Sequence, residues 1–553
     1  MTRKKSRARA RARQRATAAA DPPPAPARPS PRFGAAPGLA LAALSGVLWF
    51  LACTPFDLWG LAWIAMLPVL YAIECAPTPA RAALCGWVAG AVATGGGFYW
   101  LIDLMRRFAG FPLAAAVLVF VAFCAYHGLI FMASAWLLRR LRGRFAWPLA
   151  LLCPLVVVAC ERLLPEIFPW GLWITQAWHP LVLQIAEWTG PLGVTALLLL
   201  VNGALYDLLR RRRAALAPAL AAAGVLGAVL AGGALRMQQV DALQARAPRL
   251  VVGLVQPNAP YPIDGPIPAA LAAEMVAGLK SQTERLARAG AELVVWSEGS
   301  FPYALRRDFA RDLAAGSPQA LRPAGAPPLV VGTTTWAAAL QDVYNSALLL
   351  DADGRVLGRY DKVRLLAFGE YVPAIETLPW LRALLPEGAG RFTAGSGPVT
   401  MPLPGPAGRD RRLAPIICYE DILPGYLRRV GALRPDLLVN LTSDGWFGAA
   451  AEPWQHLALS VFATIELRTA LVRAVNSGVS ALVDANGRVV ARSYAIDPYR
   501  DPHPADGLLV TAPLLEGGHT VFAAVGQLFA DLCVALVAVL LALALRAGRR
   551  ARS

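Results

Sequence analysis

The sequence predicts a polytopic α-helical membrane domain of about eight transmembrane helices joined to an α/β domain. Of the 553 residues, 56% are hydrophobic and only 16% are charged. That composition is too apolar for an ordinary soluble protein and indicates a membrane protein. Between the last two apolar segments, short β-rich runs alternate with helical patterns, which is typical of an α/β domain.

The membrane domain is predicted over residues 36–240. Seven apolar segments follow one another there, each close to the ~20 residues that cross a bilayer. They lie near residues 36–55, 58–74, 82–103, 112–138, 145–163, 191–209 and 215–235. The stretch "PEIFPWGLWITQAWHP" before the sixth segment is rich in tryptophan, and we expect it to lie at the membrane interface.

Four further parts complete the predicted organisation. Residues 1–35 are basic and then rich in proline and alanine, which predicts a disordered cytoplasmic tail and no signal peptide. The α/β domain is predicted over 245–518, an eighth helix over 521–546 and a short cytoplasmic tail over 547–553.

The distribution of basic residues orients the predicted helices. A net charge of +17 could suggest nucleic-acid binding, but the arginines cluster beside apolar runs and no nucleic-acid-binding motif accompanies them. Basic clusters lie at both termini and after the fourth and sixth apolar segments. If each segment crosses the membrane once, all four clusters lie on the same side, which their basic charge identifies as cytoplasmic. This places the 245–518 domain on the extracytoplasmic side. Arg106 and Arg107, after the third segment, are the one pair that contradicts this orientation.

Within the α/β domain, runs that are apolar throughout predict strands buried on both faces. The six β-rich runs are "RLVVGLVQPN", "AELVVWSEGS", "PLVVGTTTW", "SALLLDADGRVLGRY", "LAPIICYED" and "DLLVNLTSD". Helical patterns occupy 269–290 and 455–475. "DADGR" and "DANGR" predict hairpin turns.

Cys418 differs from the other seven cysteines. Those seven lie in or beside apolar segments, where a thiol acts as a small hydrophobic group. Cys418 is the only cysteine of the polar domain, so it has no partner there for a disulfide, and no CxxC pair suggests a metal. It is therefore either core filling at a strand end or a reactive thiol.

Three motifs at strand ends decide between these interpretations. "VVWSEGSFPY" carries Glu298, "YDKVRLLAFGEYVP" carries Lys362 and Glu370, and "IICYED" carries Cys418. A thiol is mostly protonated at neutral pH, so a nearby carboxylate is needed to take its proton. An ammonium favours the thiolate and can stabilise an oxyanion. Together these groups predict acyl transfer through a thioester.

Each residue taken alone also has a structural explanation. Glu298 could cap a helix near Gly299, Lys362 could be a solvated charge, and Glu370 could be a salt-bridge partner. His456 could suggest a Cys-His pair, but its place near a helix start favours capping or packing. The joint occurrence of the three motifs carries the prediction.

The motifs "WSEGSFPY", "YDKVRLLAFGEYVP", "ICYED" and "NLTSDGWFG" resemble the carbon–nitrogen hydrolase (nitrilase) superfamily. With the eight-segment layout, the chain is similar to bacterial apolipoprotein N-acyltransferases over about residues 36–546. The resemblance implies an α-β-β-α sandwich. It also implies Glu298 as general base, Lys362 as oxyanion stabiliser, Cys418 as nucleophile and Glu370 as supporting carboxylate. Tyr419 and Glu420 match the residues that follow the nucleophile in that family.

The same resemblance implies an activity. Members of the family transfer a fatty acyl chain from a membrane phospholipid to the N-terminal cysteine of diacylglyceryl-modified apolipoproteins, in the bacterial inner membrane. We therefore expect lipid and lipoprotein partners, a monomer, and no cofactor, metal or nucleic acid.

Four positions depart from the family pattern. The pattern commonly has histidine where this chain has Arg364, proline at Ala367, asparagine at Ser443, and "QGN" where Gln256 to Asn258 read "QPN". The triad of Glu298, Lys362 and Cys418 is complete, so the departures bear on loop details and substrate preference.

Two other functions stay open at this point. A membrane-tethered amidase or nitrilase would use the same triad with water as the acceptor. A transporter or lipid-binding scaffold that has lost catalysis would need no triad, so the complete triad argues against it.

Overall fold

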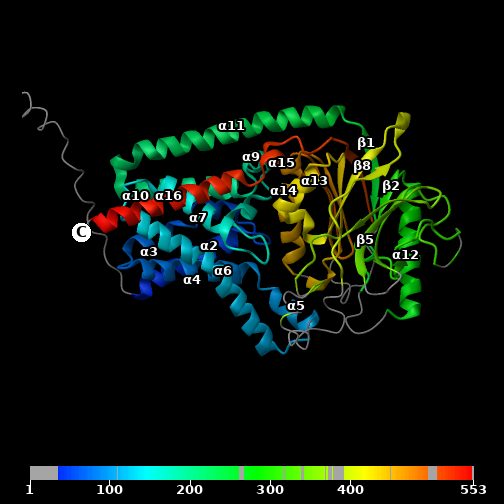
Figure 1. The fold of residues 1–553 in the computed structure, drawn as a ribbon, viewed down its shortest axis with the longest axis horizontal. Coiled ribbons are helices and arrows are strands. Elements are labelled where there is room, and N and C mark those ends of the chain that lie inside the picture. The colour runs from blue at the N-terminus through cyan, green and yellow to red at the C-terminus, as the bar shows by residue number, and fades with distance from the viewer. Residues whose placement is uncertain are drawn as a thin grey trace, which may run out of the picture.

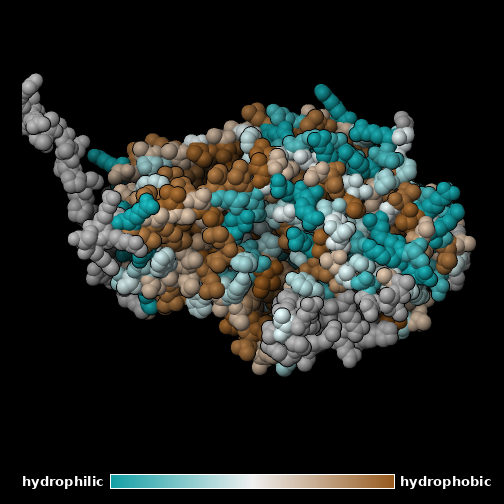
Figure 2. Space-filling model, in the orientation of Figure 1, coloured by the Kyte–Doolittle hydropathy of each residue, from teal (hydrophilic) through white to brown (hydrophobic). Residues whose placement is uncertain are grey.

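The computed structural model describes residues 35–550 except for short internal gaps. The gaps are at 109, 261–266, 315–316, 318, 338–341, 368, 372–376, 378–391, 449 and 496–506. The predicted N-terminal tail therefore lies outside the described residues. The chain forms a helical half and a sheet half that lie end to end (Figure 1). Hydrophobic residues cover much of the helical half in the view of Figure 2, while hydrophilic residues are more frequent on the sheet half.

The helical half contains helices from all eight predicted apolar segments. They are α2 (Ala35–Ala52), η1 (Trp59–Trp63), α3 (Leu67–Cys75), α4 (Pro79–Gly97), α5 (Leu101–Phe108), α6 (Leu113–Arg142), α7 (Leu149–Leu163), α10 (Leu192–Arg211), α11 (Leu216–Arg246) and α16 (Leu528–Arg550).

Fewer of these helices meet the length and hydropathy expected of a membrane span. Four do so among the described residues, and a fifth span results if α4 and α5, which meet at an angle of 55°, are counted as one. The four are Leu113–Arg142, Leu192–Arg211, Arg213–Arg246 and Leu528–Arg546. The count of about eight spans stays a prediction.

Small residues allow the helices to approach closely. A Cβ atom on Gly86 of α4 would lie 2.2 Å from the carbonyl oxygen of Phe131 on α6. Only glycine fits at this distance, as in other membrane helix pairs whose backbones touch. The α4–α6 pair thereby forms a rigid contact that ends at the bend before α5.

The first sheet has seven strands in the order β13-β1-β2-β4-β5-β6, with β3 paired to β4. Strands β1, β2 and β4 are parallel to one another, and the outer strands are antiparallel. The strands are β1 (Arg249–Leu254), β2 (Leu293–Val295), β3 (Leu305–Arg306), β4 (Leu329–Trp336), β5 (Val343–Leu350), β6 (Val356–Asp361) and β13 (Leu508–Pro513).

The second sheet has six strands in the order β12-β11-β10-β9-β8-β7, and β8, β9 and β10 are parallel. They are β7 (Met401–Leu403), β8 (Arg411–Ile417), β9 (Leu437–Thr442), β10 (Leu471–Val475), β11 (Gly478–Val483) and β12 (Val489–Ala495). Helix α12 (Ala269–Arg288) covers the first sheet, while α13 (Pro424–Gly431) and α14 (Glu452–Leu467) lie between the second sheet and the helical half (Figure 1). The predicted α-β-β-α sandwich is the observed fold of this half.

One predicted helix was too long. The pattern over 455–475 predicts a single helix, but α14 ends at Leu467 and β10 begins at Leu471. Arg468 takes a left-handed conformation with φ 52°, which stops the helix, and the following residues pair with β9 and β11. Both predicted hairpin turns are confirmed, because "DADGR" joins β5 to β6 and "DANGR" joins β11 to β12.

The tryptophan-rich stretch contributes buried rings to the interior of the protein. Trp170 and Trp173 are buried, and the ring of Trp173 meets Phe462 of α14 edge-on at 4.7 Å between centroids. Trp173 therefore packs between the helical half and α14, whereas the ring of Trp170 meets Phe98 within the helical half at 4.8 Å between centroids. The placement of this stretch at the membrane interface stays a prediction.

Candidate active site

The strand-end motifs come together where the two sheets face each other. Glu298 follows β2 and Lys362 follows β6 of the first sheet, while Cys418 directly follows β8 of the second. Carboxyl ends of parallel strands are the usual place for a ligand site in α/β folds. Cys418 begins the short helix η6 (Cys418–Ile422) with φ 54°, a conformation that is uncommon for a residue with a side chain.

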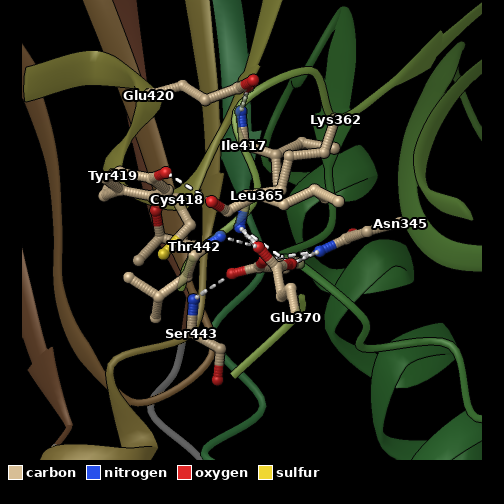
Figure 3. Close-up of polar contacts among 12 residues, drawn as sticks. Asn345, Lys362, Leu365, Glu370, Ile417, Cys418, Tyr419, Glu420, Thr442 and Ser443 are labelled. Atoms are coloured by element: carbon tan, nitrogen blue, oxygen red, sulfur yellow. Dashed lines mark hydrogen bonds and ion pairs between the residues drawn. The ribbon is translucent and has the colours of Figure 1, made fainter. Parts of the chain in front are cut away.

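Two carboxylates hold the ammonium group of Lys362. Its Nζ lies 3.2 Å from Oε1 of Glu298 and 2.9 Å from Oε2 of Glu370, and its side chain is only 2% exposed. Asn345 on β5 donates through Nδ2 to both carboxylates, at 2.7 Å to Glu298 and 2.9 Å to Glu370. Figure 3 shows these contacts around Lys362, Glu370 and Asn345. The arrangement fixes one cation between two anions at the sheet ends.

The sulfur of Cys418 lies beside this cluster (Figure 3), and its side chain is partly exposed. Asn440 on β9 donates through Nδ2 to the carbonyl oxygen of Cys418 at 3.0 Å, which holds the unusual backbone in place. Burial, together with the negative charge of Glu298, raises the pKa of the Cys418 thiol well above its ordinary value, and Lys362 opposes this. The resting group is therefore a neutral thiol that needs a base.

The charges of Glu298 and Lys362 suit that requirement. Burial raises the pKa of Glu298, and Lys362 opposes the increase. Burial acts to lower the pKa of Lys362, but Glu298 and Glu370 outweigh it, so that pKa is raised and the ammonium stays charged. A carboxylate whose pKa is raised toward neutrality is a better proton acceptor than an ordinary one.

Tyr419 and Glu420 position the loops around the site. Glu420 is fully buried and accepts hydrogen bonds from the backbone of Val363 at 2.9 Å, Arg364 at 2.8 Å and Ile417 at 2.9 Å. Its carboxylate therefore ties the segment after Lys362 to the segment before Cys418. The hydroxyl of Tyr419 donates to the carbonyl of Leu365 at 2.7 Å (Figure 3), and its ring lies 5.6 Å from the Lys362 ammonium.

The departures from the family pattern leave these contacts intact, because the contacts use backbone atoms. The amide of Arg364 donates to Glu420, and the amide of Ser443 donates to Oε2 of Glu298 at 3.1 Å. Any residue with an amide N–H can supply either hydrogen bond.

A buried ion network lies directly behind Cys418. Arg473 on β10 is 0% exposed and contacts Asp421 and Asp444, each at 3.0 Å. The two ring nitrogens of His456 on α14 face the same two carboxylates, at 3.1 and 3.0 Å. His456 therefore does not cap α14, because the N-cap of that helix is Ala451. Among the described residues, His456 makes no hydrogen bond to Cys418. The network joins η6, α14 and β10.

One part of this network has the composition of a metal site. Asp444, Glu452 and His456 place possible ligand atoms within 4.8 Å of one another. Both nitrogens of His456 already face carboxylates, however, and the guanidinium of Arg473 lies against Asp444. A cation there would be repelled by Arg473, so the residues fit an ion-pair network better than a metal centre.

Sequence reasoning did not find Asn345, Asn440 or the Asp421–His456–Asp444–Arg473 network. Asn345 and Asn440 are polar residues inside otherwise apolar strands, in "VYNSALLL" and "LLVNLT". A buried polar group needs a partner, so these positions carried a usable signal. The ion network gave a weaker signal in the sequence, because its first and last members, Asp421 and Arg473, are 52 residues apart.

Two family models match the two halves of the chain. Residues 252–495 match the model for carbon–nitrogen hydrolase, and residues 45–204 match the model for the apolipoprotein N-acyltransferase N-terminal domain. With the paired sheets and the buried Glu298–Lys362 cluster beside Cys418, these matches define a carbon–nitrogen hydrolase domain built onto a helical membrane domain.

Curated relatives narrow the family further. The chain is 31% identical to the apolipoprotein N-acyltransferase of Geobacter metallireducens over 93% of this chain and 97% of that protein. It is 31% identical to that of Bdellovibrio bacteriovorus over 82% and 85%, and 33% identical to that of Azotobacter vinelandii over 82% and 87%. The chain belongs to the apolipoprotein N-acyltransferase family.

Proposed function

We propose that this chain transfers a fatty acyl group from a membrane phospholipid, through a thioester on Cys418, to the α-amino group of a diacylglyceryl-modified apolipoprotein. The observation that carries the proposal is the buried Lys362 ammonium held between Glu298 and Glu370 beside the Cys418 thiol. Family membership supports the acyltransferase class and the lipid and lipoprotein substrates.

In the first half-reaction, Glu298 takes the thiol proton and Sγ of Cys418 attacks the ester carbonyl of the phospholipid. The Sγ–C bond forms, the ester C–O bond breaks, and the proton passes from Glu298 to the departing lysophospholipid oxygen. Lys362 stabilises the oxyanion of the tetrahedral intermediate. In the second half-reaction, the lipoprotein amine attacks the thioester carbonyl. The N–C bond forms, the C–Sγ bond breaks, and Glu298 passes the amine proton to the departing Sγ of Cys418. This scheme predicts ping-pong kinetics.

The position of the site supports a reaction between two lipid-anchored substrates. Helix α14, which carries part of the ion network, contacts elements of the helical half. Placing the thiol next to a bilayer raises the effective concentration of both substrates. We propose that residues 245–518 lie on the extracytoplasmic side of a bacterial inner membrane, with both termini cytoplasmic, and that the enzyme acts as a monomer.

Intact-protein mass spectrometry tests the thioester. Purified enzyme mixed with phospholipid but no acceptor should gain the mass of one acyl group at Cys418, and added lipopeptide should remove it. Cys418→Ala should gain nothing. An unmodified Cys418 under conditions of demonstrated lipopeptide acylation would refute the covalent mechanism. Release of ammonia from soluble amides without lipopeptide acylation would instead point to an amidase.

A further inference from the structure

A small polar pocket lies at the border between the two halves, outside the cluster around Lys362. It has a volume of about 410 Å³ and is lined by Asp103, Arg106, Arg107, Phe111, Pro112 and Leu113. That volume lies in the range of about 300–1,000 Å³ that is usual for small-ligand sites. The two arginines are the pair whose position contradicts the basic-residue pattern of the other segments.

The helix that carries the arginines is amphipathic. In α5, Leu101 is buried, and Leu104 and Met105 pack partly buried against the main core. Arg106 is exposed and Arg107 is half-buried on the pocket side. The apolar side chains thus anchor α5 while both arginines line the pocket. Two arginines and Asp103 leave the lining with a net charge of +1.

An apolar surface begins at the same pocket. Leu113, the first residue of α6, lines it and is 55% exposed. Further along α6, Leu118 and Val121 are 71% and 56% exposed. Hydrophobic residues are visible on the projecting end of the helical half near this border (Figure 2). A ligand with a negative head on the arginines could therefore lay apolar chains along α6.

Contacts link the pocket to the active site. Helix α5 contacts η7 (Gly445–Phe447), and the ring of Trp100 meets Phe447 edge-on at 5.1 Å between centroids. Ser443, two residues before η7, donates its amide to Glu298. A lipid held at α5 would thus have its head beside the wall of the catalytic cluster.

We propose that Arg106 and Arg107 bind the phosphate group of the acyl-donor phospholipid. Arginine is suited to phosphate because its planar guanidinium donates two parallel hydrogen bonds to the oxygens. The inference rests on the proposed acyl transfer and adds a headgroup site to it. In this site the phosphate sets where the glycerol ester lies, and the chains run along the exposed face of α6.

The test compares two acyl donors that differ only in phosphate. Acyl-Cys418 formation is followed by intact-protein mass spectrometry in micelles that contain either phosphatidic acid, as the phospholipid, or a diacylglycerol with the same chains. Wild-type enzyme should need about tenfold less phospholipid than diacylglycerol for half-maximal rate, the effect expected of a charge-assisted hydrogen bond. Equal requirements overturn the proposal, and this result does not depend on any variant.

The variant Arg106→Gln/Arg107→Gln should raise the half-maximal mole fraction of phospholipid about tenfold. With diacylglycerol as the donor, the variant and the wild type should have the same half-maximal mole fraction. The matched control is Arg144→Gln/Arg213→Gln, which changes two exposed arginines. Arg144 lies just after the end of α6, and Arg213 lies just before α11. This control should behave as wild type with both donors. A double variant at 106 and 107 that matches wild type at every phospholipid fraction contradicts the proposal.

Two further arms separate the outcomes. Inorganic phosphate should not compete with the phospholipid at millimolar concentration, and competition would reassign the pocket to free phosphate and overturn the lipid assignment. Failure of wild-type Cys418 to be acylated by any lipid would refute the proposed function itself. Acylation of wild type without a preference for phosphate would refute only the headgroup site.

Discussion

Glu298 is the residue that we propose as the base for Cys418. The thiol is neutral at rest, because burial and the neighbouring carboxylate raise its pKa. Glu298 accepts hydrogen bonds from Asn345 and from the amide of Ser443, which fix its carboxylate. The negative charge of Glu298 contributes to the raised pKa of Cys418, and we propose that this carboxylate takes the thiol proton.

Glu298→Gln should therefore slow acyl-enzyme formation by about 10²- to 10⁴-fold, the usual contribution of a general base. Glutamine keeps an oxygen for Asn345 but cannot accept the thiol proton. Single-turnover acylation by phospholipid, read by mass spectrometry, measures the effect. Glu370→Gln is the matched control, because it also touches Lys362, and its loss should be smaller. Equal losses in the two variants would count against Glu298 as the base.

At this scale the sequence indicated the candidate reacting groups but not the residues that support them. Glu298, Lys362, Glu370 and Cys418 could be predicted because each lies in a motif at the end of a strand. Asn345 could not, because its role follows from the antiparallel pairing of β5 with β6, which places it opposite the strand end that carries Lys362. Spacing in the sequence does not show such cross-strand neighbours.

Among the elements, the network behind Cys418 holds η6, α14 and β10 together. Arg473 is enclosed, and its guanidinium shares two buried aspartates, Asp421 and Asp444, with the ring of His456. A buried charge left without its partner costs more than the pair itself contributes.

Arg473→Met should lower the free energy of unfolding by about 3–5 kcal/mol, because Asp421 and Asp444 lose one of their two counterions and His456 alone cannot balance both carboxylates. Thermal unfolding in detergent, followed by the loss of acylation competence, measures the change. Arg488→Met serves as control, since its ion pair with Asp241 is 39% and 41% exposed and should contribute at most about 1 kcal/mol. Similar melting temperatures for both variants would mean that the network does not stabilise the fold.

The same network predicts a pH dependence of stability. Burial and Arg473 act to lower the pKa of His456, but Asp444 and Asp421 outweigh them and raise it to about 9. Glu452, on the same helix, lies 3.7 Å from the ring. Because the folded pKa lies above the unfolded value, the stabilisation is complete below about pH 6.5 and is lost as pH rises through about 9.

The expected loss across this window is about 3 kcal/mol, from about 1.4 kcal/mol for each pKa unit. Melting temperature measured between pH 6 and 10 should fall for the wild type. For His456→Gln it should start lower and change less across the same range, because glutamine does not titrate. A wild-type melting temperature that is constant from pH 6.5 to 9 would contradict the charged state assigned to His456.

Helix and strand patterns predicted most elements but not where α14 stops. The apolar periodicity of 455–475 continues through Arg468, so no breaker marks the end. The helix ends there because the Arg468 side chain binds Glu187 and Gln184 in the helical half, at 2.6 and 2.7 Å. Tertiary contacts of this kind override local propensity.

In the whole molecule, those contacts are the joint between the two halves. Glu187 on α9 (Ala186–Thr189) binds Arg468 and also Arg236 of α11, the latter at 2.7 Å. Asn486 in the hairpin turn donates to Asp241 of α11 at 2.9 Å. One carboxylate thus connects the end of α14, which carries the network behind Cys418, to the helix that leads out of the helical half into β1 (Figure 1).

Glu187→Gln should loosen this joint without touching the reacting groups. Arg468 would lose its only carboxylate contact among the described residues, and the sheet half would lose a contact that holds it to the helical half. Because misplacement by about 1 Å can cost about 10²-fold, acylation of Cys418 by phospholipid in vesicles should fall by about 10- to 100-fold. Reaction with a soluble p-nitrophenyl ester, which needs no membrane, should persist near the wild-type rate.

Asp531→Asn, which removes the exposed ion pair of Arg162 within the helical half, is the control and should change neither reaction. Parallel loss of both reactions in Glu187→Gln would show that the joint supports the fold of the catalytic domain rather than its placement at the membrane.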